Sequence, residues 1–189
     1  IGRNGAAPTR YRLADLNAAL RDGAIDAVWC LRGGYGVTRI IDGVDFDVLV
    51  RRPKAVIGFS DITALLAGIT RRAGMVAFHA PVARNPMPEF SRSHFDRVLT
   101  RAEAAGLLEP LPQPAGVLVP REERVIALRE GRAEGILAGG NLTLLQCLIG
   151  TPWFPDLDGA ILLLEDVNED LYRVDRVLAH LRAIGALAR

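Results

Sequence analysis

The sequence predicts an α/β protein, in which a parallel-sheet domain is followed by a smaller α/β domain. Three observations predict it. Short apolar runs alternate with segments of helical spacing over the first half of the 189 residues, a segment with four prolines then interrupts the pattern, and a second alternation of strand and helix follows. Such alternation with short connections is typical of parallel sheets, whose functional loops lie at the carboxyl ends of the strands.

The first half opens with a helical pattern. Leu13, Leu16, Ala19 and Leu20 have the spacing of one helix face, which predicts a helix in residues 11–23. The elements after it follow from the same criteria. Strands are expected at 24–30, 54–60 and 75–81, and helical segments at 37–44, 46–53 and 61–74.

The second half repeats strand and helix after a change of texture. Residues 93–106 have a helical pattern, and the prolines that follow are typical of a linker. Later elements are β structure within 124–140, a helix at 141–152 capped by Asn141, a strand at 159–167 and an amphipathic helix at 169–187. We therefore expect a first domain at 1–107, a linker at 108–124 and a second domain at 125–189.

The composition argues against several classes of function. Half of the residues are hydrophobic and the formal net charge is +1, with no basic stripe, which argues against nucleic-acid binding. No apolar run approaches the ~18 residues that a membrane span needs. Cys30 and Cys147 lie in apolar surroundings, so we expect buried thiols in a reducing compartment. No clustered Cys/His spacing indicates a metal site.

One corner of the sequence could carry a nucleophile. The apolar strand before Gly58 runs into Phe-Ser-Asp, and a helical pattern begins at once. A serine at such a turn projects above the sheet edge, close to the positive end of the helix, where an oxyanion can be stabilised. The match to G-x-S-x-G is partial, because Ile62 takes the place of the second glycine. The alternative is that Ser60 or Asp61 caps the helix.

Two further features fit the same site, each with an ordinary alternative. The paired glycines in "LRGGYG" either form a tight turn or let the backbone approach a ligand. Glu165 and Asp166 end an apolar strand, where a carboxylate can orient a histidine or can pair with Arg173 or Arg176.

The histidines differ in their setting. His79 ends a predicted strand and could line the same pocket as the serine, whereas His94 and His180 are expected at the surface.

Taken together, these pieces resemble the LD-carboxypeptidases of serine peptidase family S66, a family that includes the microcin C7 self-immunity peptidases. The matching stretches keep the family order from Ala14 to Leu181. They are "DLNAAL", "LRGGYG", "IGFSDITALL", "FHAPV", "GGNLTLLQCLIGTPWFPD" and "ILLLEDVNEDLYRVDRVLAHL".

The resemblance implies a fold and a catalytic site. The first domain would resemble flavodoxin or a glutamine amidotransferase, and the second would be the smaller α/β domain. Ser60 would be the nucleophile, the backbone amides of Gly34 and Asp61 the oxyanion hole, and Glu165 the acid of a Ser–Glu–His triad. No metal or organic cofactor is implied.

Other expectations concern the substrate and the length of the chain. Gly33, Tyr35 and His79 would bind substrate. The family's triad histidine lies after the last helix of this sequence, which also lacks an initiator methionine. We therefore expect a segment in which both domains are incomplete.

The expected activity is release of the terminal D-alanine of murein tetrapeptide, a small peptide substrate, by a cytoplasmic homodimer during cell-wall recycling. One alternative is a microcin C7-type immunity peptidase that cleaves a peptidyl-nucleotide. In that case Trp153 could stack on the base, although it could equally be a core residue. The other alternative is a non-catalytic, peptide-binding paralogue.

Overall fold

The structure, a computed structural model, describes residues 8–108 and 126–188. Contacts divide the chain into two units: a first unit of residues 1–85 with 134–189, and a second unit of residues 86–133. All but residue 108 of the expected linker 108–124 lies outside the described residues. The predicted domain boundaries stay a prediction.

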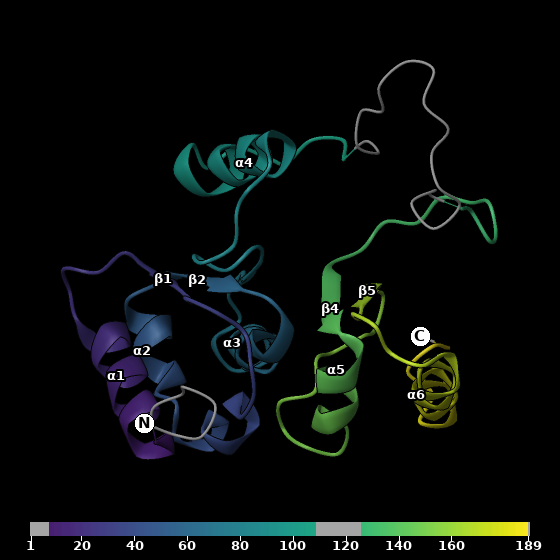
Figure 1. Cartoon of the computed structure of the whole chain (residues 1–189), viewed down its shortest axis with the longest axis horizontal. Coiled ribbons are helices and arrows are strands. Elements are labelled where there is room, and N and C mark those ends of the chain that lie inside the picture. The colour runs from purple at the N-terminus through teal and green to yellow at the C-terminus, as the bar shows by residue number, and fades with distance from the viewer. Residues whose placement is uncertain (1–7, 109–125, 189) are drawn as a thin grey trace. The chain divides into compact units, whose positions relative to one another are not determined.

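A parallel sheet forms the amino-terminal part of the first unit and confirms the predicted mixed α/β class (Figure 1). Its strands are β1 (Ala27–Trp29), β2 (Ala55–Gly58) and β3 (Phe78–His79), with β2 in the middle. Both neighbours pair with β2 in parallel. The carboxyl ends of the three strands therefore share one edge, where a doubly wound sheet holds its functional loops.

The helices of this part largely follow the apolar spacing of the sequence. They are α1 (Thr9–Arg21), α2 (Phe46–Arg51) and α3 (Thr63–Ala73). The helical segment expected at 37–44 is instead a pair of 3₁₀ turns, Val37–Arg39 and Ile41–Gly43. Gly36 precedes them at φ 100°, in the left-handed region, and the extended Val44 ends the second turn.

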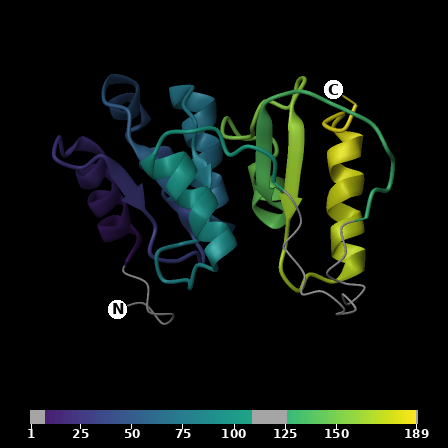
Figure 2. The same cartoon turned by 90° about the horizontal axis from the view of Figure 1, so that it is seen from above.

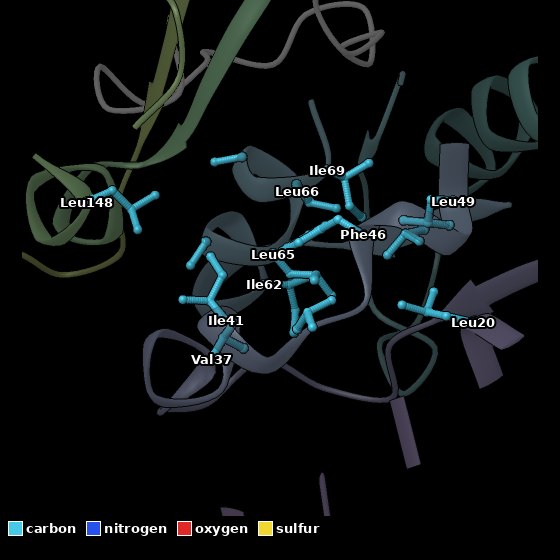
Figure 3. Close-up of a cluster of buried hydrophobic side chains, with 14 of the residues drawn as sticks. Leu20, Val37, Ile41, Phe46, Leu49, Ile62, Leu65, Leu66, Ile69 and Leu148 are labelled. Carbon is cyan, nitrogen blue, oxygen red and sulfur yellow. The ribbon is translucent and has the colours of Figure 1, made fainter. Parts of the chain in front are cut away.

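The main core joins both sequence halves of the first unit (Figure 3). Leu20 of α1, Phe46 of α2 and Leu65 of α3 belong to it, together with Val56 of β2. Leu148, from a helix more than sixty residues farther along the chain, is 1% exposed in the same cluster. Burial of these apolar side chains away from water is the main contribution to the stability of such a core.

A second parallel pair lies in the carboxyl-terminal part of the first unit. It consists of β4 (Leu137–Asn141) and β5 (Ile161–Glu165), with Asn141 opposite Glu165. Helix α5 (Leu142–Leu148) follows β4, and α6 (Leu171–Ala183) follows β5. Figure 2 shows β4 and β5 side by side with α6 next to them, and buried residues of α5 and α6 form a second apolar cluster.

Two features of this part were predicted with different success. Asn141 caps α5 as expected, because its side chain accepts a hydrogen bond from the amide of Leu144. The β structure expected within 124–140 begins only at 137, and the described residues 126–136 form no strand. Ile126 and Leu128 in that stretch are exposed, so it lacks a packed face that would support a strand.

The second unit contains α4 (Glu89–Phe95), which continues as a π-helical stretch, Asp96–Thr100. The expected helix at 93–106 is therefore wrong at both ends. Pro88 stands directly before α4, a position where proline starts a helix without losing a hydrogen bond. After Thr100 the chain reaches Ala102 at φ 52°, which is incompatible with further helix.

The two thiols differ from one another. Cys30 is partly buried, and burial raises the pKa of its thiol to about 11. Cys147 is exposed, so its expected burial is wrong, because it lies on the face of α5 opposite the packed leucines Leu145 and Leu148. In the part of the chain that the structure describes, no helix is both long and apolar enough to cross a bilayer.

Candidate active site

Ser60 occupies a strained corner between β2 and α3. It opens a 3₁₀ turn, Ser60–Ile62, that leads directly into the helix, and its φ is 62°. A non-glycine residue in this left-handed region costs about 1–3 kcal/mol, so the surrounding structure must hold it there. A serine on a strained turn between strand and helix is the geometry that exposes a nucleophilic hydroxyl.

The capping alternative is not what the structure shows. Neither Ser60 nor Asp61 makes a side-chain capping bond to this turn or to α3. The Asp61 carboxylate, only 4% exposed, accepts instead a hydrogen bond of 3.1 Å from the amide of Val37. This bond ties the glycine-rich loop after β1 to the serine turn after β2.

The same loop approaches the serine closely. A Cβ added at Gly33 would lie 3.0 Å from Cβ and 3.2 Å from Oγ of Ser60. Any side chain at Gly33 would therefore displace the hydroxyl. Gly34, the next residue, has φ 127°, a conformation that residues with a side chain seldom adopt. The paired glycines thus do more than form a tight turn, because the first of them, Gly33, makes room for the serine.

Tyr35 is the most exposed of the predicted substrate-binding residues. Its side chain stands in contact with Arg39, which donates a 3.2 Å hydrogen bond to the hydroxyl and stacks 4.9 Å above the ring. Arg12 of α1 donates to its backbone carbonyl. The aromatic face and the guanidinium together form a polar surface directly after Gly33 and Gly34.

Glu165 ends β5, and His79 ends β3. The Nε2 atom of His79 lies 4.0 Å from Oε1 of Glu165. Oε1 is buried and accepts no hydrogen bond from any described residue. The predicted alternative, an ion pair of this acid with Arg173 or Arg176, is not formed. Arg173 pairs with Glu169 and Asp170, and Arg176 lies over the ring of Tyr172.

Asp166, the other acid at this strand end, points elsewhere. Its carboxylate accepts hydrogen bonds from the hydroxyl of Thr143 and from the amide of Val167. Of the two acids, Glu165 is therefore the one that faces His79 at the end of β3.

A buried hydrogen bond joins the serine helix to the second sheet. Thr63, the first residue of α3, is completely buried, and its hydroxyl accepts the amide of Asn141 at 3.0 Å. Gly140 makes this approach possible, since an added Cβ would lie 2.7 Å from Cγ2 of Thr63 and 3.3 Å from Nδ1 of His79. Sequence reasoning missed Thr63 and Gly140; the Gly-Gly pair before a capping asparagine was the available signal.

The His79 imidazole is poised as a neutral group. Its side chain is 26% exposed, and burial lowers its pKa. The nearby Glu165 carboxylate raises this pKa, but by less than burial lowers it. The ring of Phe59 meets it edge-on at 6.3 Å between centroids. His79 thus contacts residues that precede Ser60 on one side and Glu165 on the other.

The remaining candidates are not at this site. His180 is exposed on α6, as expected, whereas His94 is partly buried, with its ring nitrogen Nδ1 at 2.8 Å from the Phe90 carbonyl. Trp153 packs against Phe46 and donates its indole N–H to Asp42. Its ring is therefore engaged in packing within the protein and is not available to stack on a nucleotide base. No group of three or more metal-ligating side chains occurs among the described residues.

Comparison with known proteins decides the family. Residues 2–80 match the LD-carboxypeptidase N-terminal domain, and residues 134–189 match the LD-carboxypeptidase C-terminal domain. The chain belongs to the LD-carboxypeptidase family. Ser60 lies within the first match and Glu165 within the second, so the contacts between these two segments join the family's two domains.

The relatives of this chain include curated sequences and solved structures. It is 37% identical over 206 residues to the murein tetrapeptide carboxypeptidase of Pseudomonas aeruginosa, covering 99% of this chain and 64% of the relative. The crystal structure of the muramoyltetrapeptide carboxypeptidase of Oxalobacter formigenes is 31% identical with a TM-score of 0.77, covering 97% of this chain and 60% of that one.

A MccF-like protein of Bacillus anthracis is similar in fold, with a TM-score of 0.79 and 26% identity over 96% of this chain and 60% of that one. MccF is a microcin C7 self-immunity protein. The present chain spans between about half and two-thirds of the length of these relatives.

Proposed function

We propose that the whole protein is a serine carboxypeptidase that hydrolyses an LD-peptide bond and releases the terminal D-alanine of murein tetrapeptide. The observation that carries the proposal is the corner at Ser60, where a strained backbone holds a hydroxyl against Gly33 at the start of α3. The murein tetrapeptide carboxypeptidases among its relatives support the substrate class.

In this mechanism the Ser60 hydroxyl attacks the carbonyl carbon of the scissile bond. The developing oxyanion is stabilised by the backbone amides of Gly34 and Asp61. Two features support this role: the hydrogen bond from Val37 to Asp61 fixes the two loops to each other, and the positive end of α3 lies directly behind the turn. Removing one such donor typically costs about 10²–10³-fold in rate.

Glu165 is the proposed acid that orients the general base. Its position at the end of β5, with its side chain only 28% exposed, supports this role, because a carboxylate largely out of water requires hydrogen-bond donors. The base itself is proposed to be a histidine of the whole protein's C-terminal domain. His79 is a poor candidate for the base, since its Nδ1 lies against Gly140 while its Nε2 faces the acid.

The substrate side of the site is proposed to include Gly33 and Tyr35. His79, which was also expected to bind substrate, faces Glu165. Exposed Tyr35, stacked with Arg39, offers an aromatic face and a positive charge, which suit a peptide with a terminal carboxylate. The proposal further includes a cytoplasmic homodimer that works without a cofactor.

The test is hydrolysis of murein tetrapeptide by the full-length protein and by Ser60→Ala. We expect the substitution to lower the kcat of D-alanine release by about 10⁶-fold, as for the serine of a catalytic triad. Ser93→Ala is the matched control, because Ser93 is exposed on α4 and bonds only its own helix. Equal D-alanine release from wild type and Ser60→Ala would reject the serine mechanism.

A second candidate is a peptidase that cleaves a peptidyl-nucleotide, as in microcin C7-type immunity. The similarity to the MccF-like structure favours it. The packing of Trp153 on Phe46 speaks against that residue as the base platform. Assays with tetrapeptide and with peptidyl-nucleotide in parallel separate the two activities, and a non-catalytic paralogue would bind peptide and cleave neither.

A further inference from the structure

His79 and Glu165 face each other at two strand ends, and the proposed mechanism gives this contact no role. Oε1 of Glu165 is buried with no hydrogen bond from the described residues, and leaving such an atom without a partner destabilises the folded state. The charged or titratable group that faces it is the His79 imidazole, with Nε2 at 4.0 Å. A hydrogen bond requires an approach to about 3 Å, so the pair is close to but outside bonding distance.

The imidazole is held in place from several sides. His79 pairs with Gly58 in the sheet, and the next residue, Ala80, donates its amide to the Gly58 carbonyl. Its Nδ1 side lies against Gly140, where the missing side chain leaves room for the ring, and Phe59 meets its edge. The carboxylate is carried by β5, whose last residue is paired with Asn141. Both partners therefore come from strand ends rather than from free loops.

A hydrogen bond between the two groups would require one particular tautomer of the imidazole. An ionised carboxylate can only accept hydrogen bonds, so the proton would have to be on the nitrogen that faces it, Nε2. Because burial lowers the pKa of His79, the ring is neutral near pH 7 and has a single N–H to give. The neighbours Phe59 and Gly140 carry no charge, which leaves Glu165 as the charged group in contact with the ring.

We propose that His79 is a positioning residue that donates its Nε2–H to Glu165 and holds the carboxylate in the orientation that the general base requires. The inference rests on the proposed function, which gives Glu165 its role. With one oxygen held by His79, the other is free to accept the bond from the triad histidine and to stabilise the imidazolium that forms. His79 thus acts through the acid and not on the peptide.

The first experiment reads the proton directly. In the full-length protein, ¹⁵N chemical shifts of the imidazole are measured at pH 7 and assigned by the signal that His79→Gln removes. We expect the Nε2–H tautomer in the wild type and a tautomer mixture in Glu165→Ala. An Nδ1–H tautomer, or a mixture that Glu165→Ala leaves unchanged, would overturn the proposal. This readout is independent of turnover, so it stands even if the assigned activity fails.

The second experiment separates positioning from substrate contact. His79→Phe keeps a ring but loses the donor, and we expect kcat to fall about ten- to a hundredfold with KM unchanged. His79→Gln retains an N–H donor and should recover kcat to within about threefold of wild type. His180→Phe, at an exposed position of α6, is the matched control and should change neither constant.

The kinetic constants of the His79 variants can each contradict the proposal. A rise in KM at constant kcat would assign His79 to the substrate and overturn the proposal, as would equal losses for the Gln and Phe variants. Should His79→Phe fail to fold, the tautomer measurement and the Gln variant still test the bond. A failure of the proposed function is detected separately, because Ser60→Ala would then release D-alanine at the wild-type rate.

Discussion

At the scale of single residues, the backbone conformation of Ser60 destabilises the folded state, and this effect does not depend on its hydroxyl. Its φ of 62° is a conformation that glycine adopts freely and alanine does not. We expect Ser60→Gly to be more stable than Ser60→Ala by about 1 kcal/mol, although both remove the hydroxyl. Urea unfolding of the two variants measures the difference. Equal free energies of unfolding would mean that the corner is not strained.

His79 makes a second residue-scale prediction, on pH. Burial lowers its pKa in the folded state below the ordinary value of 6.5, so the unfolded state binds more protons in the window between the two values. The stability linked to His79 is fully present above pH 6.5 and is lost as the pH falls through the folded-state pKa.

The measurement compares free energies of unfolding of wild type and His79→Gln at pH 8 and pH 5. Because glutamine does not titrate, we expect the wild type to lose more stability than the variant between these pH values. The charge of Glu165 opposes the lowering of the pKa and so narrows the window. A constant difference between the two proteins at both pH values would contradict the assignment.

At the scale of elements, Thr63 connects the start of α3 to the turn between β4 and α5. Thr63→Val keeps the shape but removes the acceptor of the Asn141 amide in a completely buried place. We expect a loss of about 1–3 kcal/mol, the cost of an unsatisfied buried donor. Thr63→Ser keeps the acceptor and should lose only about 1 kcal/mol, for one methyl group.

Denaturant unfolding of the two variants ranks them, and the rate of tetrapeptide hydrolysis reports whether the site is displaced. The same bond links the serine turn to the strand that pairs with β5, so we expect Thr63→Val to lower kcat more than Thr63→Ser does. If valine proved as stable as serine at this position, the hydrogen bond would contribute nothing.

The elements also show what sequence reasoning could reach. The unit of β2, the Ser60 turn and α3 was predictable, because an apolar run and a helical spacing meet within a few residues. The pair of 3₁₀ turns at 37–43 was not, since the amide of Val37 bonds Asp61, a contact that local spacing does not encode. The roles of Ser60, Glu165 and the oxyanion amides stay predictions.

The contacts that join the site lay beyond sequence reasoning for a physical reason. Thr63 with Asn141 and His79 with Glu165 are separated by about eighty residues or more, and spacing carries no information on pairs so distant. The family resemblance placed Ser60 and Glu165 in one site. It did not show that Gly140 brings His79 and Thr63 to the same strand end.

At the scale of the whole molecule, residues 1–85 and 134–189 form a single unit with a shared core. Leu148 of α5 is buried in the cluster of α1, α2 and α3, and Trp153 bonds Asp42 across the same boundary. The segments that carry Ser60 and Glu165 are thus fixed to each other by apolar packing. Loss of this packing should affect both segments together.

We expect Leu148→Ala to lower the free energy of unfolding by about 2–5 kcal/mol, because it leaves a cavity in the shared core. The two tryptophans of the chain lie in different segments, Trp29 in β1 and Trp153 after α5. In Trp29→Phe and Trp153→Phe backgrounds, fluorescence during urea unfolding follows the remaining tryptophan. The core shared by both segments predicts that Leu148→Ala lowers the two midpoints by the same amount.

Leu128→Ala is the matched control, because that leucine is 97% exposed and its truncation should shift neither midpoint. A shift of the Trp153 midpoint alone would show that α5 unfolds apart from the first sheet. In that case the packing around Leu148 could not be what holds Glu165 beside His79, and the short polar contacts at the strand ends would have to do so alone. Equal shifts would mean that one cooperative core positions both halves of the site.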